Sequence, residues 1–290
     1  MAIDYRLFDN ANAYRPRIPE VAQLFSTVFQ RAFPVDAWGQ WYLNNPYGDP
    51  YVALGYCADE LVAHHALVPQ MLVGNGGERR RYLLSMSTMV HPRHRNLSAF
   101  LYMVDALHEK ARDAGAAFIL AFPNSSSAPL FEKLCGYKPM VQTELCNWKP
   151  PAPSGASNAR INGPWEVRGK PQYSYPADSV YWNWRTQNNH ASSCAVDGTL
   201  HLAYKVIEPA TLMLLDARVE GEQDPAECLA DFANAQGLPE VRLTRYHAAL
   251  LGIPEADLTP HEGYVVRFFG FPLAEEVPDI RFSLLLSDVF

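Results

Sequence analysis

Cysteine is scarce in this 290-residue sequence, and the few cysteines follow no pairing pattern. Their number is odd, no CxxC pair occurs, and they stand apart at Cys57, Cys135, Cys146, Cys194 and Cys228. Disulfide frameworks and zinc sites both need paired, regular spacing. We therefore expect reduced, mostly buried thiols and no metal site.

Long apolar runs are also missing. The longest, Ala116 to Phe122, is far shorter than the roughly 20 residues that cross a bilayer. The first residues, Met1 to Arg6, carry Asp4 and lack the basic start and apolar stretch of a secretory signal. The sequence therefore predicts a cytoplasmic protein with no membrane partner.

Positively charged residues are fewer than negatively charged ones. The 24 Lys and Arg residues face 31 Asp and Glu residues, and the net charge of −7 opposes binding to a phosphate backbone. The motifs of P-loop proteins, α/β hydrolases and dinucleotide dehydrogenases are absent. A hydrophobic content of 48% nevertheless excludes a disordered chain. We expect a folded protein that binds small molecules and no nucleic acid.

Composition divides the chain near its middle. The stretch from Lys149 to Gly169 contains PPAPSG followed by small and polar residues, which form no periodic helix or strand. We expect one domain over residues 1–150, a linker over 151–169 and a second domain over 170–290.

The first half predicts a helix and then a strand-rich α/β unit. Apolar spacing, glycines and prolines predict these elements: helix 21–32, strands 51–56 and 61–73, a GNGG turn at 74–77, strand 82–90, helix 100–111 and strand 116–122. The last three form a βαβ unit.

A similar order recurs after the linker. Strand Thr211 to Val219, helix Pro225 to Ala235 and strand Val241 to Tyr246 repeat it, although the two stretches share few residues. The chain is therefore expected to hold two copies of one α/β fold.

The turn His91 to Phe100 is the first candidate for chemistry. It is basic and leads into a helix N-terminus, where free N–H groups and the helix dipole favour a pyrophosphate. An ordinary βα turn, with Asn96 or Ser98 capping the helix, is the alternative. The corresponding turn of the second copy, Glu220 to Asp224, carries three carboxylates and would repel a phosphate.

These residues resemble a known family. The stretches VHPRHRNLSAFLYMVDAL and AFILAFPNSSSAPLFEKLCGYKP are similar to the cofactor-binding region of the GNAT superfamily of acyl-CoA-dependent N-acyltransferases. That family has a V-x-P-x-x-R-G-x-G turn and a later N … F/Y-E-K-L-G-F/Y motif. The stretch WYLNNPYG at 41–48 is similar to the W-x-Y-x-x-N-P-x-G of a tandem-GNAT branch that includes nucleotide-sugar N-acyltransferases. The late YWNWR at 181–185 and the terminal SDVF resemble the second half of that branch.

The resemblance implies an α/β fold of two GNAT-like lobes, each a mixed sheet flanked by helices, with the second lobe degenerate. It implies that the first lobe binds acyl-CoA, acetyl-CoA or a short acyl-CoA, as co-substrate without a metal. The residues it assigns to the cofactor are Met89, Val90, Arg95, Asn96, Leu97, Ser98, Ala99, Phe100, Asn124 and Phe131.

Four positions depart from the family. Asn96 and Ser98 replace glycines of the pyrophosphate loop, Phe131 replaces a proton-donating tyrosine, and Ser87 stands where several members have an acidic base. The catalytic residues we expect are therefore Asn124, beside the thioester, and His65, as a base on the neighbouring strand. A buried core histidine is the alternative for His65.

The expected acceptor site draws on both lobes. Its residues are Trp41, Tyr42, Asn45, His65 and Ser87 from the first lobe, and Trp184, Arg185 and Asp288 from the second. The aromatic residues among them are also typical of a core.

The sequence thus predicts an N-acyltransferase that moves an acyl group from acyl-CoA to a small primary amine, with a nucleotide-linked amino sugar as one candidate. A non-catalytic CoA-binding or scaffold protein and an aminoacyl-tRNA-dependent transferase are the alternatives. The acyl group, the amine, the pathway and the oligomeric state stay open.

Overall fold

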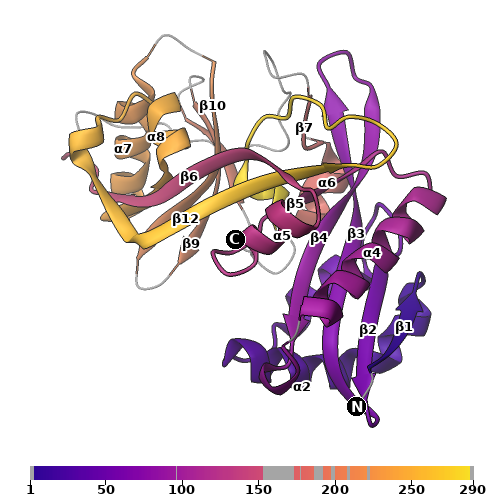
Figure 1. Cartoon of the computed structure of the whole chain (residues 1–290). Coiled ribbons are helices and arrows are strands. Elements are labelled where there is room, and N and C mark those ends of the chain that lie inside the picture. Colours follow the sequence, from indigo (N-terminus) through magenta and orange to yellow (C-terminus); the bar gives the residue numbers. More distant parts are fainter. Residues whose placement is uncertain are drawn as a thin grey trace. The chain divides into compact units, whose positions relative to one another are not determined.

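Two units, each a mixed sheet flanked by helices, make up the chain in the computed structural model (Figure 1). The structure describes residues 3–95, 97–152, 173–176, 178–185, 192–196, 200–207, 210–220 and 223–287. Unit 1 comprises Met1–Met140, Lys170–Ser174 and Phe268–Ile280, and unit 2 comprises Val141–Gly169, Tyr175–Arg267 and Arg281–Phe290. The predicted α/β class is confirmed. The predicted linker, 151–169, lies outside the described residues from position 153 onward.

The sheet of unit 1 has the order β1-β2-β3-β4-β5-β12, and β4 and β5 are its parallel pair. Its last strand comes from late in the chain, because Phe269 to Pro272 of β12 pair with β5. The short strand β7 pairs with the end of β3. The strands are β1 (Asp4–Phe8), β2 (Tyr51–Cys57), β3 (Glu60–Gly74), β4 (Arg79–Val90), β5 (Phe118–Ala121), β7 (Tyr173–Ser174) and β12 (Leu258–Pro272).

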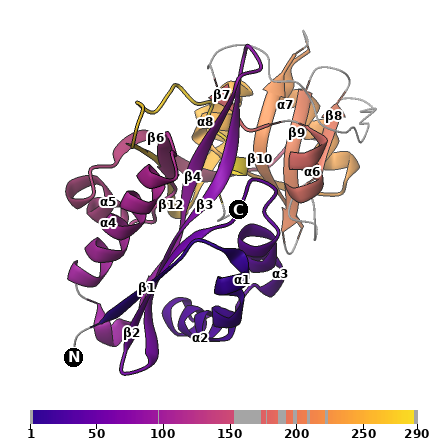
Figure 2. The ribbon, with the colours of Figure 1, turned by 90° about the vertical axis from the view of Figure 1, so that its right-hand side faces the viewer.

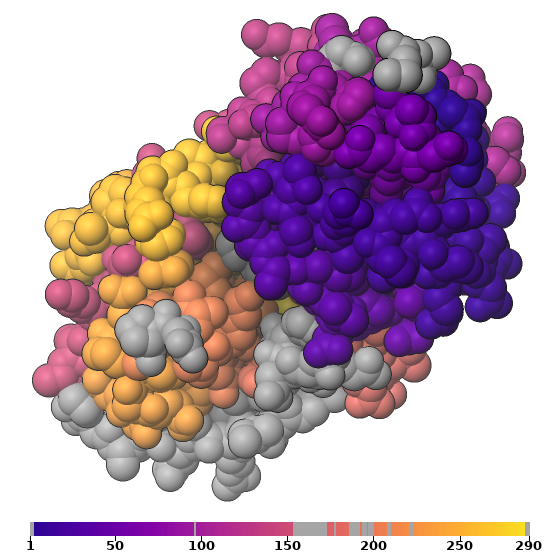
Figure 3. All heavy atoms as spheres, turned by 90° about the horizontal axis from the view of Figure 1, so that it is seen from below, coloured from indigo at the N-terminus to yellow at the C-terminus, as the bar shows by residue number. Residues whose placement is uncertain are grey.

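Helices cover both faces of this sheet (Figure 2). One face carries α4 (Leu97–Asp113) and α5 (Ala128–Leu134), whose apolar side chains pack on Leu67, Leu83 and Ile119. The other face carries the N-terminal helices, whose atoms form the indigo surface in Figure 3. These are α1 (Ala11–Tyr14), α2 (Ile18–Phe29), α3 (Val35–Trp38) and the π-turn Gly39–Leu43.

The predicted elements of the first half are present, with ends shifted by a few residues. Helix α4 buries Phe100, Met103 and Leu107, as its apolar spacing requires. It ends before Gly115, whose φ of +70° is a conformation that glycine adopts without strain. The GNGG turn joins β3 to β4, and the Gly77 N–H donates to the Gly74 carbonyl.

Unit 2 repeats the core of unit 1. Its sheet has the order β6-β11-β10-β9-β8, in which β10 and β11 are parallel, and α7 packs against it through Leu229, Phe232 and Ala233. The elements are β6 (Lys138–Trp148, from Val141 in this unit), α6 (Ser179–Arg185), β8 (Ser192–Val196), β9 (Leu200–Ile207), β10 (Thr211–Val219), α7 (Pro225–Ala235), β11 (Glu240–Thr244) and α8 (Arg245–Leu250).

The predicted repeat is confirmed by these pairings. The series β9-β10-α7-β11 has the same order and the same strand directions as β3-β4-α4-β5. One predicted boundary was wrong. The strand expected to reach Tyr246 ends at Thr244, because the Thr244 hydroxyl accepts from the His247 N–H and so caps α8.

Candidate functional site

Strands β4 and β5 separate part-way along β4. Their parallel pairing begins at Leu83 and ends where Ser85 lies opposite Ala121. Strand β5 stops there, whereas β4 continues for five residues to Val90. Among the described strands no other pairs with β4 on this side. A stretch of strand edge is therefore left open between the two strands, and it leads toward helix α4.

A bulge marks the point of separation. The register of β3 and β4 shifts between His64, opposite Met89, and Ala66, opposite Met86, so β4 carries one extra residue. Ser87 lies in this bulge with a φ of +50°, in the left-handed region that few residues other than glycine adopt. The bulge turns β4 away from the regular ladder at the place where its edge opens.

The direction of the strand amides follows from one hydrogen bond. The His91 N–H donates to the Val62 carbonyl of β3 at 2.7 Å. Because successive residues of a strand point to opposite sides, the backbone of Met89 also faces β3, and that of Thr88 and Val90 faces the open edge. Of the two amides predicted to bind the cofactor, that of Val90 is on the open side and that of Met89 is not.

Beyond Val90 the chain makes a basic turn into α4. Arg95 is exposed, and its Nε donates to the Val90 carbonyl at 3.4 Å. Arg93 pairs with Glu60 at 3.3 Å, and the His91 side chain accepts from the Arg93 N–H. Both the basic side chains and the helix dipole favour an anion here.

The first turn of α4 divides into exposed and buried residues. Leu97 and Ser98 are exposed, whereas Ala99 and Phe100 are buried in the core between helix and sheet. The turn carries no acidic residue. Asn96 lies outside the described residues. Of the predicted loop, Arg95, Leu97 and Ser98 can therefore meet a ligand through their side chains, and Ala99 and Phe100 only through the backbone.

The two residues predicted from the later motif have structural partners. The Asn124 side-chain oxygen accepts from the Ser126 and Ser127 N–H groups at 3.0 and 2.9 Å, and so closes the turn before α5. Phe131 is 3% exposed and packs edge-on against the rings of Phe100 and Tyr137. The oxygen of Asn124 is thus already used, and the Phe131 ring belongs to the core.

His65 is fully buried on the face covered by α4 and α5. Its Nδ1 lies 2.7 Å from the Thr88 hydroxyl, and its Nε2 has no hydrogen-bond partner in the described chain. Burial, followed by repulsion from His108, lowers the pKa of His65 to about 3. A neutral ring without solvent contact does not reach an amine directly, so we do not assign His65 as the base.

A second buried pair lies on the same face of the sheet. His108 Nε2 and the Tyr137 hydroxyl are 3.0 Å apart. Burial lowers the pKa of His108 to about 4 and raises that of Tyr137 well above its ordinary value, although a hydrogen bond from Tyr137 to Ser85 opposes the rise. Both groups are therefore neutral at ordinary pH.

The predicted acceptor residues of the first half are mostly buried or already bonded. Trp41 is 5% exposed and Tyr42 1%, and Tyr42 stacks on Trp38 with ring centres 4.4 Å apart. Asn45 donates to the Pro69 carbonyl at 2.8 Å and accepts from the Tyr47 N–H. Ser87 is half-buried in the β4 bulge.

The acceptor residues predicted from the second half belong to unit 2. Trp184 and Arg185 lie in helix α6, and both are buried. The Arg185 guanidinium donates to the Ser287 carbonyl at 3.1 Å. Asp288 lies outside the described residues. Trp184 and Arg185 thus take part in the internal packing of unit 2.

Unit 2 has its own pair of separating strands. The pairing of β10 with β11 ends where Met213 lies opposite Arg242, while β10 continues to Val219. The register of β10 with β9 also shifts, between Leu214 and Asp216. The geometry that opens β4 in unit 1 is therefore repeated on β10.

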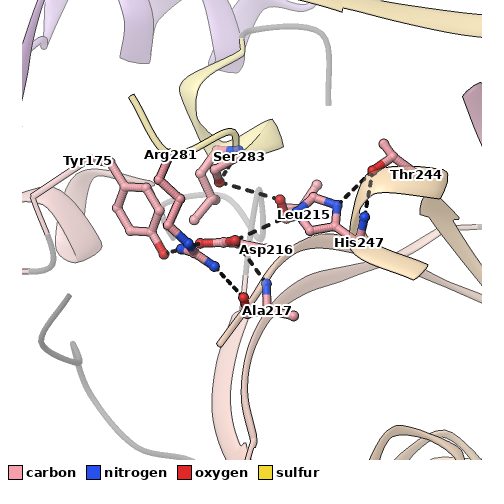
Figure 4. A network of polar contacts seen from close by, with 9 residues as sticks. Tyr175, Leu215, Asp216, Ala217, Thr244, His247, Arg281 and Ser283 are labelled. Atoms are coloured by element: carbon pink, nitrogen blue, oxygen red, sulfur yellow. Dashed lines mark hydrogen bonds and ion pairs between the residues drawn. The ribbon is translucent and has the colours of Figure 1, made fainter. Parts of the chain in front are cut away.

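The chain itself fills this second opening (Figure 4). The Ser283 hydroxyl donates to the Leu215 carbonyl at 3.4 Å, and the Arg281 guanidinium donates to the Ala217 carbonyl. Arg281 also pairs with the fully buried Asp216 at 2.7 Å. Asp224 then caps α7 by accepting from two backbone N–H groups, which takes up the donors an anion would use. Unit 2 therefore offers no open strand edge at β10.

His64 was considered together with His65 from the sequence but was not chosen, and it lies on the opposite face of β3 from His65. Its Nδ1 donates to the Ser87 carbonyl in the bulge at 2.8 Å, and its Nε2 accepts from the Tyr14 hydroxyl at 3.1 Å. Adjacent histidines on a strand point to opposite faces. The signal in the sequence was therefore the pair itself, but alternation did not say which member bonds to the neighbouring strand.

The described residues contain neither a cluster of metal ligands nor a membrane-spanning helix. No group of three His, Cys, Asp or Glu side chains within them is placed to hold a metal ion. No described helix is long and apolar enough to cross a membrane.

Comparison with known proteins fits this geometry. Residues 13–140 match the family model for the acetyltransferase (GNAT) domain. A GCN5-related N-acetyltransferase from Kribbella flavida is similar over 94% of this chain and 72% of its own, with 12% identity and a TM-score of 0.60. The chain has the GNAT fold.

Two further GNAT structures are similar along nearly the whole chain. A tandem GNAT protein from the clavulanic acid biosynthesis pathway is covered over 100% of its length and covers 95% of this chain, with 12% identity and a TM-score of 0.57. A glucosamine N-acetyltransferase region of a fungal multi-domain β-N-acetylglucosaminidase covers 93% of this chain, which spans 38% of that protein, with 10% identity and a TM-score of 0.59. No curated protein sequence matches the chain. The predicted arrangement of two GNAT-like lobes is thus confirmed as a fold.

Proposed function

We propose that unit 1 binds acyl-CoA, acetyl-CoA or a short acyl-CoA, and transfers the acyl group to a primary amine by direct attack. The observation that carries this proposal is the contrast between the two units. Both have a bulged strand that separates from its parallel neighbour, but the edge is open beside β4 and filled by Arg281 and Ser283 beside β10. One chain therefore offers one cofactor site.

The residues of unit 1 fit the parts of acyl-CoA. The open edge of β4 presents the Val90 N–H to an extended amide-containing arm, as a further strand would pair with it. The Arg95 guanidinium and the first-turn N–H groups of α4 suit the pyrophosphate. A strand N–H at the open edge can also polarise the thioester carbonyl, which is the main electrostatic demand of acyl transfer.

Proton transfer has no side chain assigned to it. Phe131 carries no acidic proton, and His65 is buried with its pKa lowered to about 3. Holding the amine against the thioester supplies several kcal/mol by itself, and a water molecule can carry the amine proton to solvent. The chemistry therefore rests on positioning and on the strand N–H groups.

A small-molecule amine is the proposed acceptor, and a nucleotide-linked amino sugar is the first to test. The resemblance of residues 41–48 to the nucleotide-sugar branch supports this choice, as does the similarity to a glucosamine N-acetyltransferase region. Release of free CoA thiol from acetyl-CoA, measured across a panel of amines, identifies the acceptor.

Arg95→Glu is expected to weaken acyl-CoA binding about tenfold, because it places a carboxylate beside the pyrophosphate. A thermal-shift titration with CoA, acetyl-CoA and a longer acyl-CoA measures the effect. Ligand at about 100 times its Kd stabilises the wild type by roughly 2.7 kcal/mol. Lys138→Glu, an equal charge reversal at an exposed position of β6, is the control and should bind as the wild type does. No shift with any CoA at millimolar concentration would overturn the proposal.

Isothermal titration calorimetry is expected to give a stoichiometry of one acyl-CoA per chain, since the edge of β10 is already bonded. Arg95→Glu should weaken this single site without uncovering another. A stoichiometry of two would show that Arg281 and Ser283 leave β10 when ligand is present.

A non-catalytic CoA-binding protein is the second candidate, and the buried phenyl ring of Phe131 favours it. The two candidates differ in turnover alone. A CoA-binding protein would give the thermal shift and release no thiol with any amine. Thiol release that depends on both the amine and Arg95 would exclude it.

A further inference from the structure

The β4 bulge depends on an unusual backbone conformation. Ser87 has a φ of +50°, although it is not a glycine, and such conformations persist where surrounding contacts hold them. The contact that meets the Ser87 carbonyl is the imidazole of His64, on the neighbouring strand, at 2.8 Å. The open edge of β4 begins at this bulge.

The hydrogen bonds of His64 determine which of its two ring nitrogens carries a proton and which way the Tyr14 hydroxyl donates. A carbonyl oxygen only accepts, so the Nδ1 of His64 carries the proton that bonds Ser87. Burial lowers the pKa of His64 to about 4, so the ring is neutral and Nε2 is an acceptor. Tyr14 must then donate its hydroxyl proton to Nε2, at 3.1 Å.

A further hydrogen bond links Tyr14 to the N-terminal helix α3. The Trp38 indole N–H donates to the Tyr14 oxygen at 3.1 Å, and Tyr14, Trp38 and His64 are 0%, 4% and 0% exposed. Trp38 lies in α3 and Tyr14 in α1, on the face of the sheet opposite α4. Three hydrogen bonds, two of them fully buried, therefore connect these helices to the bulge on β4.

We infer that His64 is a positioning residue that holds the bulge at Ser87 and so keeps the edge of β4 open for the acyl-CoA arm. The inference rests on the proposed function for its ligand. It assigns the two adjacent histidines different roles: His64 bonds the backbone of β4 on one face, and His65 bonds the Thr88 side chain on the other. The role of His64 is to orient strand N–H groups, without touching the substrate.

Two conservative variants separate the two bonds of His64. In His64→Asn the side-chain amide N–H lies near the place of Nδ1 and can still donate to the Ser87 carbonyl, but it does not reach Tyr14. In His64→Gln the longer amide reaches Tyr14 and not Ser87. We expect His64→Asn to bind CoA within about threefold of the wild type, and His64→Gln and His64→Leu to bind at least tenfold more weakly.

The assay is calorimetric CoA titration together with kcat and KM for acetyl-CoA. We expect KM for acetyl-CoA to rise and kcat to fall in His64→Gln, because the strand N–H groups that hold the arm and polarise the thioester carbonyl lose their orientation together, whereas both constants in His64→Asn should stay near those of the wild type. Adding Ser87→Gly to His64→Leu should restore affinity, because glycine adopts a positive φ without support. Equal binding by His64→Asn and His64→Gln, or no recovery with Ser87→Gly, would overturn the inference.

Hydrogen exchange provides a measurement that needs no ligand. The amides of residues 86–90 should exchange faster in His64→Gln than in His64→Asn, at equal melting temperature. If wild-type protein binds no CoA, the proposed function fails, and this exchange difference still decides whether His64 holds the bulge. If the wild type binds CoA and the two variants exchange alike, the inference alone fails.

Discussion

Asp216→Asn is expected to lower the free energy of unfolding by about 3–5 kcal/mol, because it leaves a buried arginine without its counter-charge. The Asp216 carboxylate accepts from the Arg281 guanidinium and from the Tyr175 hydroxyl, both at 2.7 Å, and from the Ala217 N–H (Figure 4). The asparagine amide has nearly the same shape but carries no charge and offers one oxygen instead of two. Chemical denaturation measures the loss.

The exposed Asp257→Asn provides the matched control and should change stability by less than 0.5 kcal/mol, roughly the range for surface substitutions. Combining Asp216→Asn with Arg281→Met removes both charges, so the double variant should be more stable than the sum of the two losses predicts. Strict additivity would show that Asp216 and Arg281 act independently.

The Asp216 contribution is also expected to depend on pH. Burial alone would raise the pKa of this carboxyl, but Arg281, His247 and Tyr175 outweigh burial and hold it below its ordinary value of 3.8. A carboxyl with a lowered folded-state pKa stabilises the protein above its unfolded-state pKa, and the effect is lost as the pH falls. The stability difference between wild type and Asp216→Asn should therefore be constant near pH 7 and shrink below about pH 4. A difference that grows on acidification would contradict this assignment.

The order of elements could be predicted from the sequence because the signals were local. The apolar stripe of α4, the apolar strand before the later motif and the stops at Gly115 and Gly237 are all visible within a dozen residues. Local signals fail at Thr244. Threonine has a high strand propensity, but here it caps the next helix instead of extending the strand. The pairing of Phe269 to Pro272 of β12 with β5 was not predicted, because strand pairing over more than a hundred residues leaves no local pattern.

The positions of the charged turns could be predicted from the sequence, but the directions in which the strand groups point could not. The basic turn at Arg95 and the acidic turn before Asp224 were both visible, and the structure places each before the helix expected. The choice between His64 and His65, and between Met89 and Val90, depends on a single bulge residue that shifts the strand faces. Neither composition nor periodicity shows where a bulge lies.

Two neighbouring proline substitutions on β4 are expected to lower folding stability by different amounts. Met89→Pro removes an N–H that faces β3 and leaves a ladder carbonyl unpaired, which should cost about 2–4 kcal/mol of folding stability. Val90→Pro removes an N–H from the open edge, where proline is tolerated, and should lower stability by less than about 1 kcal/mol. Thermal denaturation measures both effects.

Ligand binding should follow the reverse order once the protein is folded. Val90→Pro removes a donor to the acyl-CoA arm, and the loss of one such bond, about 1–1.5 kcal/mol, corresponds to roughly tenfold weaker binding. If that N–H polarises the thioester carbonyl, kcat falls by about a hundredfold or more, since one oxyanion donor is worth that much. Folded Met89→Pro protein, measured well below its melting temperature, keeps the Val90 N–H and should bind CoA more tightly than Val90→Pro. The reverse ranking would place the cofactor arm away from the open edge of β4, because in that case the amide facing β3 would be the one that the ligand requires.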